Sequence, residues 1–232
     1  MARAFWGNCM RPLLGIVLAV CGLGVCMAEV YDGFVVEPES ARIYLDMARR
    51  ASCGDMPGQA EWDTLFSSAA YRAFLRHTAW DVDEFKGNVR HAFELAYDPA
   101  LCAERDSVMS SVQGLDSDLP LYLSTAISIK ERLDEYSGWL DSLDLGSTVS
   151  DARQMALELL PGRGAGLNPT CSPIYFIVWY LECRSLGSGI YMDLNTFLFD
   201  GPCAATEILA HEMHHFYTQP CFEANYSGDF SR

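Results

Sequence analysis

Three residues near the end of the chain have the types and spacing that metal-assisted hydrolysis requires. His211, Glu212 and His215 form the pattern H-E-x-x-H. On a helix, side chains four residues apart leave the same face with Cβ atoms about 5–6 Å apart, so both imidazoles can reach one ion. A Zn²⁺ ion held by nitrogens at about 2.0–2.1 Å needs that convergence, and a catalytic site keeps one position open for water. Glu212 would take a proton from this water as general base and deliver it to the leaving amine.

The alternative is a chance match on an ordinary amphipathic helix. The chain has five histidines, and three of them fall within residues 211–215. The flanking residues are uncharged and largely apolar, which suits a buried active-site position. These residues are Ile208, Leu209, Ala210, Met213, Phe216 and Tyr217. The pattern therefore favours a zinc site.

A short strand-strand-helix unit must position these residues. The β-branched and aromatic run Ile174 to Tyr180 predicts a buried strand, and Ile190 to Leu194 predicts a second one after a glycine-containing turn. The helix of the motif opens after Asp200-Gly201-Pro202, where Pro202 fits the first turn. The glycine-rich segment 162–166 lacks the Gly-Lys-Ser/Thr ending of a phosphate loop, so it indicates a linker.

A mostly helical region precedes this unit. Residues 31–38 predict an extended lead-in. Apolar periodicity then predicts helices over residues 40–52, 59–77, 82–97, 101–113, 119–145 (kinked near Gly138) and 151–160. The expected fold class is α+β and predominantly helical. The expected regions are residues 1–28 as a signal peptide, 29–165 as the helical region and 166–232 as the unit that carries the motif.

The first 28 residues have the pattern of an export signal. Arg3 and Arg11 are basic, residues 13–28 are an uncharged apolar run, and Cys26-Met27-Ala28 is a small-residue cleavage pattern. We expect an exported protein, periplasmic or secreted, with no stable membrane span after cleavage. An uncleaved anchor is the minority alternative, because the run is shorter than the roughly 20 residues that a spanning helix needs.

The charge of the chain bears on its partners. The formal net charge is −15, and loss of the first 28 residues leaves fourteen basic against 31 acidic residues, or −17. Without a basic stripe, nucleic acid and anionic membrane surfaces are not expected partners. We expect a peptide or protein substrate, and the oligomeric state is left open.

Six cysteines remain after the signal: Cys53, Cys102, Cys171, Cys183, Cys203 and Cys221. An even count in an exported chain predicts disulfides. A pair between Cys203 and Cys221 is disfavoured, because one helix over residues 203–218 would separate them by about 20 Å. Free buried cysteines are the alternative.

The unit just described resembles the zincin metallopeptidases of the gluzincin type. More narrowly, Glu207-Ile208-Leu209-Ala210-His211-Glu212-Met213-His214-His215 looks like the late H-E-x-H-H helix of bacterial families of zinc-dependent peptidases of unknown substrate. The stretch Trp62 to Tyr71 looks like their N-terminal helical region. The resemblance implies zinc on His211 and His215, and an extended substrate paired with one of the two strands.

The third zinc ligand is the departure from this resemblance. Such families usually take a glutamate from a helix further downstream, whereas 17 residues follow His215. The metzincin pattern is excluded, because Thr218 and Cys221 stand where it has Gly and His. The third ligand is therefore Glu223, Asp229 or a residue beyond the given chain.

Three further residues have candidate roles. Glu207 either orients His211 through a hydrogen bond or is an acid favoured near a helix N-terminus. Tyr217 and Tyr226 are candidates for stabilising an oxyanion. Three functions stay open: an exported zinc peptidase, a truncated or non-catalytic relative that binds metal weakly, and a disulfide-bonded exported interaction protein.

Overall fold

The computed structural model describes the chain in several ranges. These are residues 16–17, 28–78, 80–110, 118–160, 171–179, 182–187, 189–196 and 204–226. For residues 16, 17, 28, 29 and 219–226 the description covers the backbone only. The expected signal segment therefore lies outside the described residues, apart from the backbone of residues 16, 17 and 28, and so does the expected boundary at residue 165.

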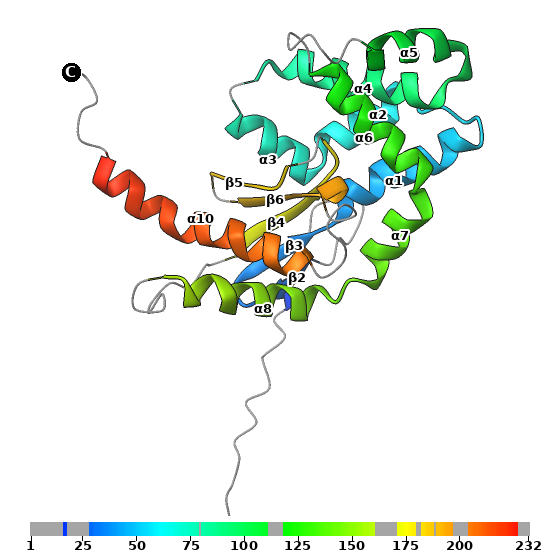
Figure 1. The fold of residues 1–232 in the computed structure, drawn as a ribbon. Helices are drawn as coiled ribbons and strands as arrows, with labels where there is room; N and C mark the ends of the chain where they lie inside the picture. Colours follow the sequence, from blue (N-terminus) through cyan, green and yellow to red (C-terminus); the bar gives the residue numbers. More distant parts are fainter. Residues whose placement is uncertain are drawn as a thin grey trace, which may run out of the picture.

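One mixed sheet lies at the centre of the described chain (Figure 1). Its strand order is β1-β2-β3-β4-β6-β5. β3, β4 and β6 run parallel to one another, and the remaining pairs are antiparallel. The strands are β1 (Ile16–Val17), β2 (Ala28–Tyr31), β3 (Phe34–Glu37), β4 (Ser172–Ile177), β5 (Arg184–Leu186) and β6 (Gly189–Asp193).

The segment expected to be an extended lead-in is a hairpin within this sheet. Tyr31 pairs with Phe34 across the two-residue turn Asp32-Gly33. Both turn residues have positive φ, 50° and 87°, as a type I′ turn requires. Val36 then pairs in parallel with Ile174 of β4. The sheet thus joins chain segments from both sides of the long helical region.

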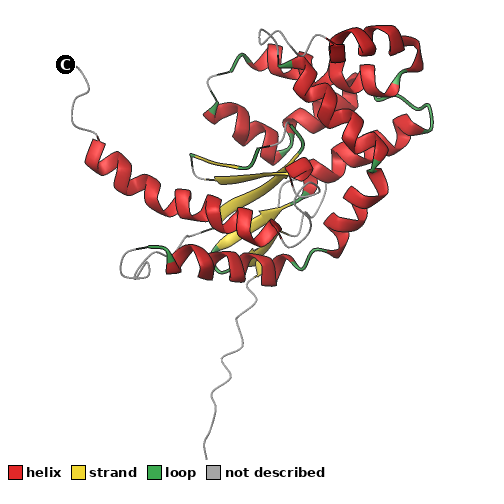
Figure 2. Cartoon of the chain, in the orientation of Figure 1, coloured by secondary structure: helices red, strands yellow, loops and turns green. Residues whose placement is uncertain are grey.

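Helices account for most of the described chain, as Figure 2 shows. They are α1 (Glu39–Ser52), α2 (Gln59–Ser67), α3 (Ala69–His77), α4 (Val82–Tyr97), a 3₁₀ turn η1 (Pro99–Leu101), α5 (Cys102–Ser110), α6 (Leu119–Glu131), α7 (Leu133–Ser142), α8 (Leu145–Glu158) and α10 (Ala204–Tyr226). The expected α+β, predominantly helical class is confirmed.

Two layers of helices cover the sheet (Figure 1). α8 and α10 lie side by side on one face, where the ring of Phe34 meets Phe216 and Tyr217 of α10. α1 and α3 cover the other face, where Phe74 of α3 packs edge-on against Tyr191 of β6. The alternation of side chains along the strands therefore buries both faces of the sheet.

Two expected helices are each divided in the structure. The segment 59–77 breaks at Ser68, which is extended (ψ 159°) and whose hydroxyl bonds to Leu65 O and to Ser40 Oγ, at 2.6 and 2.7 Å. The segment 119–145 breaks at Arg132 (φ −125°) and not at Gly138, which lies inside α7. Serine side chains compete for backbone groups in this way, and the break at Ser68 therefore rests on its bond to Leu65 O and on its contact with Ser40 of α1.

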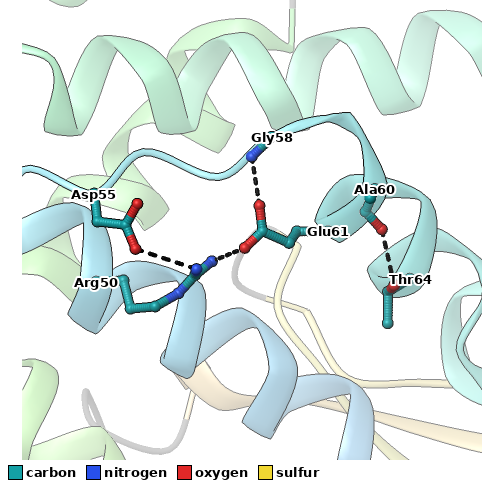
Figure 3. A network of polar contacts seen from close by, with 6 residues as sticks. All are labelled: Arg50, Asp55, Gly58, Ala60, Glu61 and Thr64. Atoms are coloured by element: carbon teal, nitrogen blue, oxygen red, sulfur yellow. Dashed lines mark hydrogen bonds and ion pairs between the residues drawn. The ribbon is translucent and has the colours of Figure 1, made fainter.

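The junction between α1 and α2 is held by charged contacts (Figure 3). The guanidinium of Arg50 pairs with Asp55, at 3.2 Å, and with Glu61. The other oxygen of Glu61 accepts the backbone N–H of Gly58, which satisfies a donor at the start of α2. These contacts fix the orientation of α2 relative to α1.

Among the described residues, no helix is both long enough and apolar enough to cross a lipid bilayer.

Candidate metal centre

Helix α10 presents the motif with its two histidines outward. Leu209, Met213 and Tyr217 lie on the inner side of the helix, at most 5% exposed. His211 and His215 are exposed, one turn apart on the opposite side. The apolar positions thus anchor α10 on the sheet and leave the imidazoles open to a ligand.

The two imidazoles converge. Their Nε2 atoms lie 3.0 Å apart, with ring centroids 4.5 Å apart and ring planes at 86°. Two nitrogens on one tetrahedral zinc at about 2.0–2.1 Å would be separated by roughly 3.3 Å. A small rotation of either ring reaches that separation, so the pair fits a zinc ion.

Glu212 lies on a neighbouring part of the helix surface and points toward β5. It is 7% exposed, and its carboxylate accepts a hydrogen bond from the backbone N–H of Ser185. A carboxylate has two oxygens and about four acceptor positions, so this bond leaves acceptor capacity for a proton from water. The side chain is thus held by the edge of the sheet.

Burial changes the protonation of this site. Burial raises the pKa of Glu212 to about 7, opposed by the Ser185 N–H and the Arg184 guanidinium and reinforced by Glu182. Burial and the neighbouring rings of His211 and His214 lower the pKa of His215. A lowered pKa favours the neutral imidazole, which is the form that binds metal.

Within the described part of the chain, the motif has no third ligand. No group of three His, Cys, Asp or Glu side chains there comes together as a metal site. α10 continues as one helix through Glu223, whose Cα lies about 12 Å along the axis from that of His215. Glu223 is therefore poorly placed to share an ion with the histidine pair. Asp229 lies outside the described residues.

Comparison with known proteins identifies the family. A family model matches residues 62–231, more than half of the chain, and its description is "Putative zinc dependent peptidase (DUF5700)". The chain belongs to this family. No curated protein and no solved structure matches the chain. The match confirms the coarse expectation of a zinc-dependent peptidase family with zinc as its cofactor. The gluzincin type stays a prediction.

Glu207 and Tyr217, for which the sequence suggested roles in the site, also lie on α10, but at other positions around the helix. Glu207 is exposed in the first turn of the helix, where an acid interacts favourably with the helix dipole. Tyr217 is 5% exposed and packs on Phe34, about 200° around the helix from His215. Tyr217 therefore contributes to the core. The side chain of Tyr226 lies outside the described residues.

Sequence reasoning missed β5. Ser185 on this strand binds Glu212, and Arg184 pairs with Glu182 and lies with its Cζ 5.7 Å from the ring centre of Trp179. A three-residue strand is too short for a periodic pattern, and the sequence shows only a turn there. A polar cluster of Glu182, Cys183 and Arg184 between two strands was the available signal.

The expected disulfides do not form among the described cysteines. Cys53, Cys102, Cys171 and Cys183 are free thiols, and the first three are exposed. The side chains of Cys203 and Cys221 lie outside the described residues. The expectation of disulfides was wrong for these four cysteines.

Proposed function

We propose that this chain is a peptidase in which His211 and His215 hold zinc and Glu212 is the general base. The observation that carries the proposal is the convergence of the two Nε2 atoms, 3.0 Å apart, in a chain of a zinc-dependent peptidase family. When bound, zinc would acidify a water molecule and polarise the scissile carbonyl.

Glu212 supplies the proton chemistry in this proposal. Its carboxylate takes a proton from the attacking water and gives it to the leaving amine. Burial between α10 and β5 keeps the carboxylate from rotating freely, since Ser185 N–H holds one oxygen. A fixed base beside the histidine pair needs little reorganisation during the reaction.

An extended peptide is the proposed substrate, and β5 is the strand that it would join. β5 is the last strand of the described sheet. One of its edges pairs with β6, and its other edge pairs with no strand among the described residues. The other edge of β5 faces α10 at Ser185. A peptide along this edge would lie near Glu212, and because the Ser185 N–H is already engaged by Glu212, it would pair with the remaining backbone groups of the edge.

A second candidate is a relative that binds metal weakly without catalysis. The observation in its favour is that the described residues provide two ligand nitrogens and no third ligand. The disulfide-bonded interaction protein loses support, because the four described cysteines are free thiols.

One experiment separates these functions. Zinc content and peptide hydrolysis are measured for the purified protein, Glu212→Gln, His211→Ala and, as the matched control on the same helix, His214→Ala. The proposal expects one zinc per chain, loss of activity in Glu212→Gln with zinc retained, and loss of zinc in His211→Ala alone. Zinc without hydrolysis supports the second candidate. Absence of zinc from the unaltered protein overturns both.

We further propose export of the chain, supported by the basic residues Arg3 and Arg11 before the apolar run 13–28. Cell fractionation with N-terminal sequencing tests it. The expected mature chain begins near Glu29 and is absent from the cytoplasmic fraction; a cytoplasmic chain that retains Met1 contradicts the proposal.

A further inference from the structure

A cavity lies between α2, α3 and α4, on elements that do not carry the histidine pair. It is partly open to solvent and has a volume of about 510 Å³, within the roughly 300–1,000 Å³ typical of small-molecule sites. Trp62 and Phe66 of α2 form an aromatic wall, with ring centres 5.8 Å apart and planes at 21°. The cavity therefore offers an apolar surface for part of a ligand.

Positive charge gathers at this cavity in an acidic protein. Arg72 of α3 and Lys86 and Arg90 of α4 line it, together with Asp63 and Asp83. Three cations against two carboxylates give a lining of net charge +1, in a chain of net charge −15. This balance favours an anion over a neutral or cationic ligand.

The three cations differ in how they are engaged. Arg90 bonds to Glu94 at 2.9 Å and to Gln59 at 2.7 Å. Lys86 lies with Nζ 5.7 Å from the ring centre of Phe66, and Arg72 is exposed and near enough to Glu37 for its charge to oppose the raised pKa of that carboxyl. Arg72 and Lys86 are thus the cations that an anionic ligand would meet.

We propose that this cavity binds a carboxylate carried on an apolar body. Arg72 and Lys86 pair with the carboxylate, and Phe66 contacts the apolar part of the ligand. Two sources share this chemistry: a free organic acid and the C-terminal carboxylate of a peptide. The proposal goes beyond the metal-dependent function and does not depend on it.

Contacts between the helices fix the walls of the cavity. α2 is fixed to α1 through Arg50 and Glu61 (Figure 3), and Gln59 links α2 to Arg90 of α4. Trp62 also packs edge-on against Phe93 of α4, with ring centres 5.3 Å apart. Little ordering would be needed on binding, which lowers its entropic cost.

Calorimetry on the full chain tests the proposal with N-acetylphenylalanine and its amide as probes. We expect saturable binding of the acid and at least about tenfold weaker binding of the amide, the loss of one charge-assisted contact. Arg72→Gln and Lys86→Gln should each weaken the acid about tenfold. Arg42→Gln, an exposed arginine of α1 paired with Asp141, is the matched control and should bind unchanged.

A blocked tripeptide ending in phenylalanine, as acid and as amide, separates the two sources in the Glu212→Gln protein, where cleavage is not expected. Binding of the peptide acid or of N-acetylphenylalanine, with their amides weaker, supports the proposal and names the source. Equal binding of acids and amides, no binding of either acid, or equal losses in Arg42→Gln and Arg72→Gln overturns it.

Discussion

The backbone N–H of Ser185 donates a hydrogen bond to the carboxylate of Glu212 and so ties the edge strand β5 to the helix of the histidine pair. Glu212 as a whole is 7% exposed, and its ionised form is favoured by this bond and by the nearby Arg184 guanidinium. β5 is therefore part of the support of the candidate base as well as the edge of the sheet.

The first prediction separates the backbone and the side chain of Ser185. Ser185→Pro removes the N–H and leaves the buried carboxylate with one donor fewer, which should lower the free energy of unfolding by about 1–3 kcal/mol. Ser185→Ala keeps the N–H and removes a hydroxyl that has no partner among the described residues, so it should be neutral or slightly stabilising. Urea unfolding measures both. Equal losses in the two variants would contradict the importance of the backbone bond.

The second prediction concerns the turn after β5. Gly187 has φ +57°, and a Cβ built there would lie 2.5 Å from Cε1 of His77. Gly54 also has positive φ, +89°, but has open space around it. Gly54→Ala should cost about 1–2 kcal/mol through the left-handed backbone alone, and Gly187→Ala should cost more, because the imidazole must move as well.

Thermal or urea unfolding of the two alanine variants measures that difference. In a His77→Ala background the excess cost at Gly187 should disappear, while the backbone cost remains. An unchanged excess without the imidazole would show that another contact is responsible.

Local patterns predicted much of the fold. The apolar periodicity of residues 82–97 gave α4 with both of its ends, because Asp81 caps the helix and Asp98-Pro99 follow it. The H-E-x-x-H spacing likewise predicted the convergence of His211 and His215, since the geometry of one helix fixes it.

Contacts between distant segments were beyond these patterns. The Asp32-Gly33 turn is a strong hairpin signal for β2 and β3. The pairing of β3 with β4, however, joins residues more than 130 positions apart, and no local pattern indicates it. The break at Ser68 depends on Ser40 of another helix. The support of Glu212 by Ser185 depends on a strand of three residues, too short to show a period.

The third prediction is a pH dependence at the junction of Figure 3. The pKa of Glu61 lies below its ordinary value of about 4.5, first because it accepts the Gly58 N–H and second because it pairs with Arg50. A depressed carboxyl pKa contributes stability that is present above the unfolded value and is lost as pH falls through the folded pKa. The stability advantage of the unaltered protein over Glu61→Gln should therefore be present near neutral pH and vanish on acidification below about pH 4.5.

Urea unfolding across this pH range measures the effect. Arg50→Gln is the informative companion, because it removes the ion pair and leaves the Gly58 bond. The free energy of unfolding of Arg50→Gln should exceed that of the double variant Arg50→Gln with Glu61→Gln. This difference should be smaller than the one between the unaltered protein and Glu61→Gln, and it should also decline on acidification. A difference that grew as the pH fell would have the wrong sign for this mechanism.

The fourth prediction concerns the thiols. Burial raises the pKa of Cys183, and the carboxylates of Asp193 and Glu212 act in the same direction. The thiolate is the reactive form, so at about pH 8 Cys183 should be alkylated at least about tenfold more slowly than the exposed Cys53, Cys102 and Cys171. Iodoacetamide labelling followed by peptide mass spectrometry gives each rate. In urea the four rates should become similar, whereas fast labelling of Cys183 in the folded chain would show that β5 opens readily from α10.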